Sequence, residues 1–406
     1  MSGGPRGDVT RSGPPSPRTH GGCGRRPRAS RRPAPRAARR PPRSPRTPAT
    51  SPLAETPAEA KARIRPARIR PARARSALAL GLLLCFLVLA AAVLASLFIG
   101  SGHDVSGGDV FHALFDADLS DKGQLVVHEV RIPRTAAGVL AGIALGLAGC
   151  VMQGVARNPI ADPGLLGINA GSSVAVVAAI SLLGLASPSQ YIWFGFLGAL
   201  LAALLVYGIG SLGREGATPV KLALAGTATQ AVLVALTSAI LLKDRDSYDQ
   251  YRFWQVGSLT GRDGSDLWQA LPFIAVGAVL ALALGPALNA LSLGDDLARG
   301  LGQKVGRTRA GSALVVVILC GAATAIVGPI AFVGLAVPHA ARLITGPDYR
   351  WILPYSAVLA PVLLLLADIV GRLVARPGEV QVGVITAAIG CVPFIILVRR
   401  RKLVEL

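Results

Sequence analysis

Long apolar runs separated by short polar segments dominate residues 77–398 of this 406-residue chain. Each run is close to the length that an α-helix needs to cross a bilayer, whereas a helix on a water-soluble core would carry one polar face. The pattern predicts an all-α polytopic membrane protein with about ten transmembrane helices. The predicted spans are residues 77–99, 135–156, 164–184, 191–212, 219–242, 268–289, 310–328, 331–345, 352–371 and 381–398.

Two places interrupt this pattern. The runs on either side of Gly328-Pro329 are short, which fits either two short helices joined by a tight turn or one broken span. After the second run come Asn158-Pro159 and Asp162-Pro163, followed by Gly164. Proline stops a helix, and broken backbone at membrane depth is tolerated only where protein or a water-filled cavity covers it. This segment is therefore a candidate wall or gate of a translocation path.

The polar segment 288–309 has a regular pattern of charged and apolar residues that a simple connector would not need. Ser292 is placed to cap a short helix, and Asp295 and Asp296 would lie in its first turn, where carboxylates favour the positive end of the helix dipole. Three leucines recur every four residues and form one apolar stripe: Leu293, Leu297 and Leu301. Such a stripe beside a membrane has to be covered. Either another protein docks on it, or the leucines pack against neighbouring membrane helices.

Composition agrees with a membrane protein, since 52% of the residues are hydrophobic. The formal net charge of +20 belongs mostly to residues 1–76, which hold 20 of the 42 Lys and Arg residues. This Arg/Pro-rich tail is too poor in apolar residues to form a core, so we predict that it is disordered and that residues 77–406 form the membrane domain. It is an unstructured leader, a stretch that results from a start codon placed too far upstream, or a basic arm that contacts anionic lipid.

The bias of Lys and Arg between loops predicts the orientation. Ten spans place both termini on one side, and the loops on that side hold 13 basic residues against nine on the other. We therefore expect a plasma-membrane protein with both termini and segment 288–309 in the cytoplasm. Membrane lipid is an expected contact, and nucleic acid is not.

On the predicted outer side, Arg131, Arg134 and Arg372 lie at the ends of spans. They could hold carboxylates of a partner or anchor to lipid phosphates. Asp368, the one acid inside a predicted span, precedes Arg372 by one helical turn, so an ion pair explains it more simply than a proton relay does.

No enzyme or metal motif is found in the sequence. It lacks a Gly-x-x-x-x-Gly-Lys-Ser/Thr phosphate loop, a Gly-x-Ser-x-Gly elbow and a His-Glu-x-x-His zinc motif. The five cysteines share no metal or redox spacing. We expect no catalytic residue, no metal site and no disulfide.

Several segments, in order along residues 77–400, resemble the permease subunits of ABC importers for ferric siderophores, haem and vitamin B12. They are Arg131-Ile-Pro-Arg134, Gln153, Asn158-Pro159-x-Ala-Asp-Pro-Gly-Leu-Leu-Gly167, Trp254-x-x-Gly-Ser-Leu259, Leu291-Ser-Leu-Gly-Asp-x-Leu-Ala-Arg-x-Leu-Gly302, Gly328-Pro-Ile-x-Phe-Val-Gly-Leu-x-Val-Pro-His339, Leu366-Ala-Asp-Ile-Val-x-Arg372 and Gly383-Val-x-Thr-Ala387.

The resemblance implies the type II ABC importer permease architecture, with two permease subunits around one path. Two cytoplasmic ATPase subunits would bind the ATP, and an extracytoplasmic binding protein would deliver the chelate. In this family Arg131, Arg134 and Arg372 match positions that contact the binding protein, and Thr218 and Pro219 fall at an inner gate. The ATPase-coupling residues would be Leu291, Leu293, Gly294, Asp295, Leu297, Ala298, Arg299, Leu301 and Gly302.

Some positions depart from the family pattern. Pro219-Val220 replaces small hydroxylated residues at the gate, Gln381 replaces a proline, and Cys391-Val392-Pro393 replaces Gly-Ala-Pro. The basic tail has no counterpart.

The sequence favours an ABC importer permease for an iron–siderophore or a similar metal chelate. One alternative is an ion-coupled secondary transporter, which would need an intramembrane charge relay. The other is a membrane scaffold or receptor whose segment 288–309 recruits a signalling protein.

Overall fold

The computed structural model describes residues 75–100, 105–115, 120–185, 187–213, 218–243 and 245–399. The chain divides into two units, Met1–Arg70 and Pro71–Leu406. The first unit lies wholly outside the described residues. The predicted disordered tail, residues 1–76, lies outside them except for its last two residues.

The described residues form helices joined by short segments, with no strand among them. The helices are α2 (Arg75–Phe98), α3 (Gly107–Phe115), α4 (Lys122–Val126), the π-helical η1 (Val127–Arg131), α5 (Ile132–Ala156), the 3-10 helix η2 (Pro163–Leu166), α6 (Ile168–Leu183), α7 (Pro188–Gly210), α8 (Pro219–Lys243), α9 (Arg245–Gln255), α10 (Gly264–Ala283), α11 (Gly285–Ser292), α12 (Asp295–Gly300), α13 (Val305–Val327), α14 (Val333–Thr345), α15 (Tyr349–Val374) and α16 (Val382–Arg399).

Each predicted span coincides with helix, which confirms the all-α membrane fold. Within the described residues, seven helices are long and apolar enough to cross a membrane, and α6 and α16 contribute shorter apolar stretches. The run at 268–289 is two helices, α10 and α11, in the structure. At Gly328-Pro329 the chain forms two helices, of which α13 is full length and α14 has only 13 residues.

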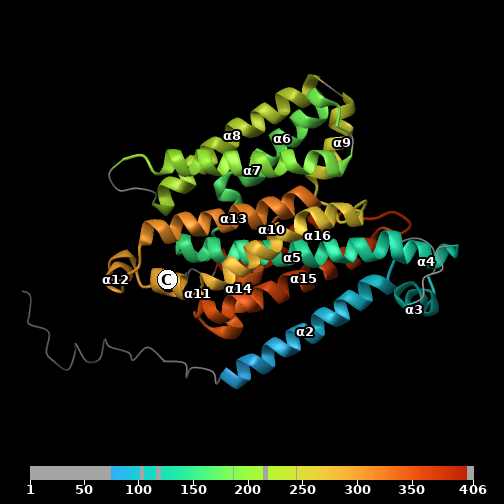
Figure 1. Ribbon diagram of the computed structural model, residues 1–406, viewed down its shortest axis with the longest axis horizontal. Coiled ribbons are helices and arrows are strands. Elements are labelled where there is room, and N and C mark those ends of the chain that lie inside the picture. Colours follow the sequence, from blue (N-terminus) through green and yellow to red (C-terminus); the bar gives the residue numbers. More distant parts are fainter. Residues whose placement is uncertain are drawn as a thin grey trace, which may run out of the picture. The chain divides into compact units, whose positions relative to one another are not determined.

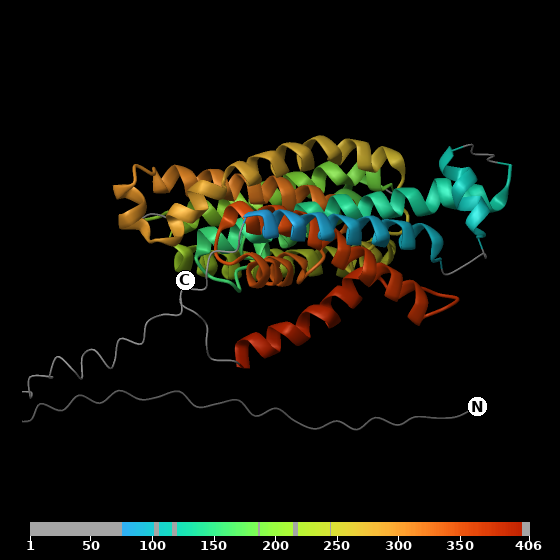
Figure 2. The same ribbon diagram turned by 90° about the horizontal axis from the view of Figure 1, so that it is seen from below.

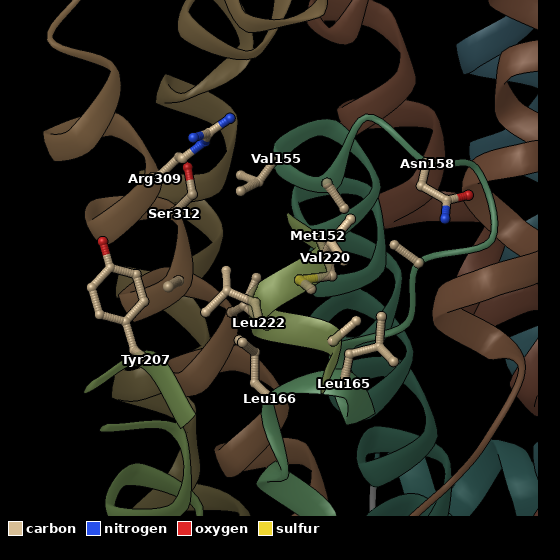
Figure 3. A pocket seen from close by; sticks show the side chains of 15 residues that line it. Met152, Val155, Asn158, Leu165, Leu166, Tyr207, Val220, Leu222, Arg309 and Ser312 are labelled. Carbon is tan, nitrogen blue, oxygen red and sulfur yellow. The ribbon is translucent and has the colours of Figure 1, made fainter. Parts of the chain in front are cut away.

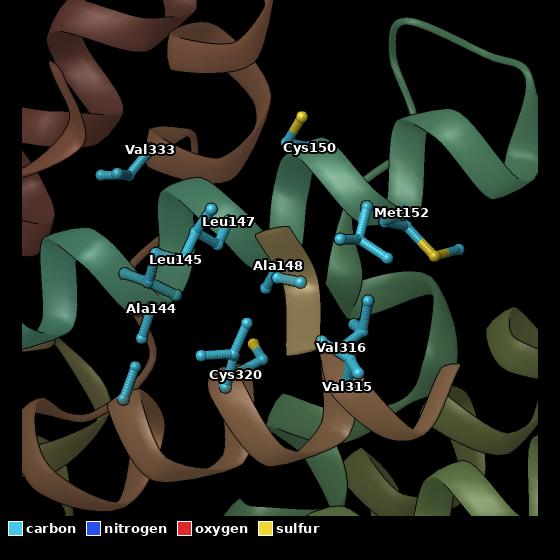
Figure 4. Packing of buried hydrophobic residues seen from close by; sticks show 14 of the residues in the cluster. Ala144, Leu145, Leu147, Ala148, Cys150, Met152, Val315, Val316, Cys320 and Val333 are labelled. Carbon is cyan, nitrogen blue, oxygen red and sulfur yellow. The ribbon is translucent and has the colours of Figure 1, made fainter. Parts of the chain in front are cut away.

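Helix α5 lies at the centre of the membrane domain and packs against α15, α13, α14 and α10 (Figure 1). Its glycines allow this close approach because they present no side chain to the neighbouring backbones. Gly142 faces the backbone of Pro361, Gly146 faces Ser356, and Gly149 lies directly against Gly334. Figure 4 shows apolar side chains of α5 and α13 packed between these two helices, with Val333 of α14 nearby.

Helices α6, α7 and α8 form a second group that packs on this centre mainly through α13 (Figure 1). Gly171 of α6 and Gly198 of α7 lie against each other's backbones, and Gly226 of α8 lies against the carbonyl of Leu165. Helix α2 is peripheral: it packs on α15, and the hydroxyl of Tyr355 donates to the carbonyl of Leu78 over 2.7 Å.

The helices α11 and α12 mark one end of the bundle, and α3 and α4 mark the other (Figures 1 and 2). We call these the α12 end and the α3 end. Helix α2 begins toward the α12 end and runs to the α3 end. The two ends are therefore separated by the length of the long helices.

Gly149 provides a test of the close packing. A methyl group there would overlap the backbone of Gly334, whereas one at Gly311 of α13 would enter open space. We expect Gly149→Ala to lower the free energy of unfolding by about 1–3 kcal/mol, the usual cost of overpacking. Gly311→Ala, the matched control, should leave it unchanged or raise it by up to about 1 kcal/mol. Thermal denaturation of the purified proteins in detergent would measure both, and equal midpoints would contradict the packing argument.

Candidate functional site

The segment 288–309 contains the end of α11, the short helix α12 and the start of α13, and its three leucines are exposed. Leu293, Leu297 and Leu301 are 56%, 62% and 65% exposed, whereas Leu291 and Ala298 are buried. The two buried residues anchor the segment to the bundle. In this chain the leucine stripe therefore does not pack against the membrane helices, and that alternative is wrong.

The expected helix cap at Ser292 is also wrong. Ser292 is the last residue of α11, and its hydroxyl donates to the carbonyl of Asn289 over 2.7 Å. Helix α12 begins only after Gly294, whose φ of +104° separates the two helices and favours glycine. The chain also turns sharply after α12, at Gly302 with φ of +81°.

Asp295 joins α12 to two long helices. Its Oδ1 lies 3.0 Å from Nη2 of Arg309, near the start of α13, and 3.4 Å from Nη2 of Arg157, which caps the end of α5. Asp295 is about one-quarter exposed. The neighbouring pair of Arg299 with Asp296 is fully at the surface, where such pairs contribute little to stability. We call Asp295 with Arg157 and Arg309 the Asp295 clasp.

Side chains of the broken segment after α5 accept hydrogen bonds from backbone N–H groups of the same segment. The side chain of Asn158 accepts from the N–H of Ile160 over 3.1 Å, and that of Asp162 accepts from the N–H of Gly164 over 2.7 Å. Pro163 and Gly164 then open the helix η2. The two Asn/Asp-Pro pairs thus form local turns that redirect the chain from α5 to α6.

The predicted gate residues lie at the start of α8. The hydroxyl of Thr218 accepts from the N–H of Lys221 over 3.4 Å, as a helix cap does, and Pro219 is the first helical residue. Proline is favoured at this position because its missing N–H has no partner in the first turn. The substitution by Pro219-Val220 therefore suits a helix start, and the gate role stays a prediction.

A hollow lined by α6, α8 and α9 was missed by sequence reasoning. Its volume is about 400 Å³, and among the described residues that line it none is charged. Hydroxyl and amide side chains supply its polarity: Asn169, Ser173, Gln230, Thr237, Ser238, Tyr248, Tyr251 and Gln255. The spacing of Gln230, Thr237 and Ser238 within an apolar run was a signal that could have found it, because these positions share one side of a helix.

The three arginines of the α3 end are buried: Arg131, Arg134 and Arg372 are 5%, 6% and 1% exposed. Arg134 donates to both carboxylate oxygens of Asp368, at 2.8 and 2.9 Å, and to Glu379 at 2.7 Å. This arrangement is a bidentate pair reinforced by a second carboxylate.

The other two arginines hold the end of α2. Arg372 donates to Asp368 and, over 2.8 Å, to the carbonyls of Ser96 and Ile99. Arg131 donates to the carbonyl of Leu97 over 2.7 Å. The expected pair of Asp368 with Arg372 is present, within a larger cluster. All three guanidiniums have partners inside the chain, and their contact with a binding protein stays a prediction.

Asp368 compensates two buried guanidiniums at once, so its charge is critical to the cluster. Removing one partner of a buried ion pair costs about 3–5 kcal/mol, because the remaining charge loses its compensation. We expect Asp368→Asn to lower the thermal denaturation midpoint strongly. Glu379→Gln is the matched control, since Glu379 binds the same Arg134 and is one-quarter exposed, and its effect should be clearly smaller. Equal midpoints for both variants would contradict this assignment.

Comparison with known proteins gives one consistent result. The model of the FecCD transport family matches residues 87–400. The chain is 51% identical over 276 residues to the ferric enterobactin transport system permease protein FepD of Escherichia coli (strain K12), covering 68% of this chain and 82% of the relative. It is 38% identical to the cobalamin import system permease protein BtuC of Halobacterium salinarum, over 70% of this chain and 76% of the relative.

A solved structure agrees with this result. A chain of a metal-chelate type ABC transporter in an inward-facing conformation superposes with a TM-score of 0.69 at 27% identity. The match covers 79% of this chain and 98% of the solved one.

Proposed function

The chain belongs to the FecCD transport family, and from this membership we propose that it imports a ferric siderophore or a related metal chelate as the permease subunit of an ABC importer. Its relatives include permeases for ferric enterobactin, iron(3+)-hydroxamate and cobalamin. The observation that carries the proposal in this chain is the segment around α12 at one end of the bundle. It is anchored by the buried Leu291 and Ala298, and it exposes Leu297 within α12 and Leu293 and Leu301 on either side of that helix.

Helix α12 is the proposed contact for the ATPase subunit. Exposed apolar side chains on an anchored helix suit insertion into a cleft of a partner. ATP would be bound by that partner, with this chain contributing no nucleotide site. This assignment makes the α12 end cytoplasmic, in line with the basic residues of its loops.

The Asp295 clasp would transmit the movement of the ATPase. When α12 moves with the partner, the carboxylate of Asp295 pulls on Arg157 and Arg309, and through them on the ends of α5 and α13. Helix α8 begins in the same region, so its start would shift with them. The clasp would thus connect the ATPase subunit to the helices that surround the translocation path.

The neutral hollow between α6, α8 and α9 is the proposed contact for the chelate. Its hydroxyl and amide groups can exchange hydrogen bonds with the oxygen-rich surface of a chelate without binding it tightly through charge. A second permease subunit facing this side would complete a path between the two chains. A binding protein on the α3 end would deliver the cargo.

The secondary transporter is the less favoured alternative. It needs an ionisable group inside the membrane that can exchange protons or ions. Asp368 is bound by two arginines and is 1% exposed, so it serves the buried cluster instead.

Co-purification with the ATPase tests the role of α12. We expect Leu297→Asp to weaken binding of the ATPase to the tagged permease by about tenfold or more, because a buried leucine contributes about 1.5–3 kcal/mol and a carboxylate would have to be desolvated. Leu212→Asp is the matched control: Leu212 is 70% exposed and follows α7, outside α12. Retention of the ATPase by Leu297→Asp, or equal loss with Leu212→Asp, would contradict the assignment.

A further inference from the structure

A second cavity, of about 260 Å³, lies within the membrane domain near the α12 end (Figure 3). Its walls come from the end of α5, the segment around η2, the start of α8 and the first turns of α13, with Tyr207 of α7 at one side. Most of the lining is aliphatic, including Met152, Val155, Leu165 and Leu222. An apolar cavity of this kind favours hydrocarbon over water.

One wall of the cavity is polar. Figure 3 shows Arg309 and Ser312 together on α13, across from Met152 and Leu165. Ser312 is fully buried, and its hydroxyl has no hydrogen-bond partner among the described residues. A buried hydroxyl without a partner is unfavourable, so this position is suited to a ligand that carries an acceptor.

The charge beside Ser312 is positive. Arg309 is the one charged residue among the described residues that line the cavity, and its partner Asp295 is shared with Arg157. The guanidinium of Arg309 thus places a positive charge in the lining of the cavity, and this charge favours a ligand that carries an anionic group.

The cavity also lies near the ends of the membrane helices that form it. Ala156 ends α5, Val220 is in the first turn of α8, and Arg309 is near the start of α13. Val220, in the lining, is 69% exposed. Basic pockets between membrane helices on the cytoplasmic side bind anionic lipid headgroups, and the α12 end is the proposed cytoplasmic end.

We infer that this cavity binds an anionic phospholipid, with one acyl chain among the aliphatic residues and the phosphate accepting hydrogen bonds from Arg309 and Ser312. The bound chain would lie between α8 and the pair α5 and α13, and would fix the start of α8 against them. The inference rests on the cavity and on the proposed cytoplasmic position of the α12 end, and it does not depend on the cargo.

Native mass spectrometry of the purified full chain tests this inference, with dioleoyl-phosphatidylglycerol and dioleoyl-phosphatidylcholine added at equal concentration. The two lipids share their acyl chains and differ in net charge. We expect the wild type to bind phosphatidylglycerol preferentially. Ala313→Phe fills the cavity and should abolish that binding, whereas Ala310→Phe, on an exposed position of the same helix, should retain it.

Arg309→Gln tests the headgroup contact separately. It should weaken phosphatidylglycerol binding by about tenfold, as expected for the loss of one charge-assisted hydrogen bond. The exposed Arg307→Gln is its control. Equal binding of both lipids by the wild type would overturn the inference. So would undiminished phosphatidylglycerol binding in both Ala313→Phe and Arg309→Gln.

Discussion

The close contact of α5 with its neighbours is the constraint on which the rest of the structure depends. Between membrane helices there is little hydrophobic driving force, so association relies on packing and on contacts between backbones. Gly142, Gly146 and Gly149 bring α5 directly onto α15 and α14. The remaining helices are arranged around this centre, with α6, α7 and α8 added through α13.

Helix α5 also connects the two ends of the molecule. At its first turn Arg134 is bound by Asp368 and Glu379, and after its last turn Arg157 reaches Asp295 of α12. A rigid helix between two ionic contacts is suited to carry a small displacement along its length. This arrangement gives the proposed coupling a physical route: the partner moves α12, and the Asp295 clasp moves the ends of α5 and α13.

The apolar runs were sufficient to predict the membrane helices, because the length of such a run decides whether it spans a bilayer. The three leucines at and beside α12 could likewise be identified from the sequence, although only the structure shows that they are exposed and that Gly294 separates Leu293 from the helix. Other features depend on contacts between distant residues. Arg134 meets Asp368 across 234 positions of the chain, so its burial could not be predicted from local sequence. The hollow beside α8 forms only when α6 and α9 pack against it.

The central claim is that Asp295 couples ATP hydrolysis to transport. The most direct measurement is the number of ATP molecules hydrolysed for each ferric chelate imported, in proteoliposomes that contain the permease, its ATPase and the binding protein. For Asp295→Asn we predict nearly normal ATP hydrolysis with reduced import, and for Asp296→Asn, at the fully exposed neighbour, the wild-type ratio. A wild-type ratio in Asp295→Asn would contradict the claim. Import that needs no ATP and stops with an uncoupler would contradict the importer itself.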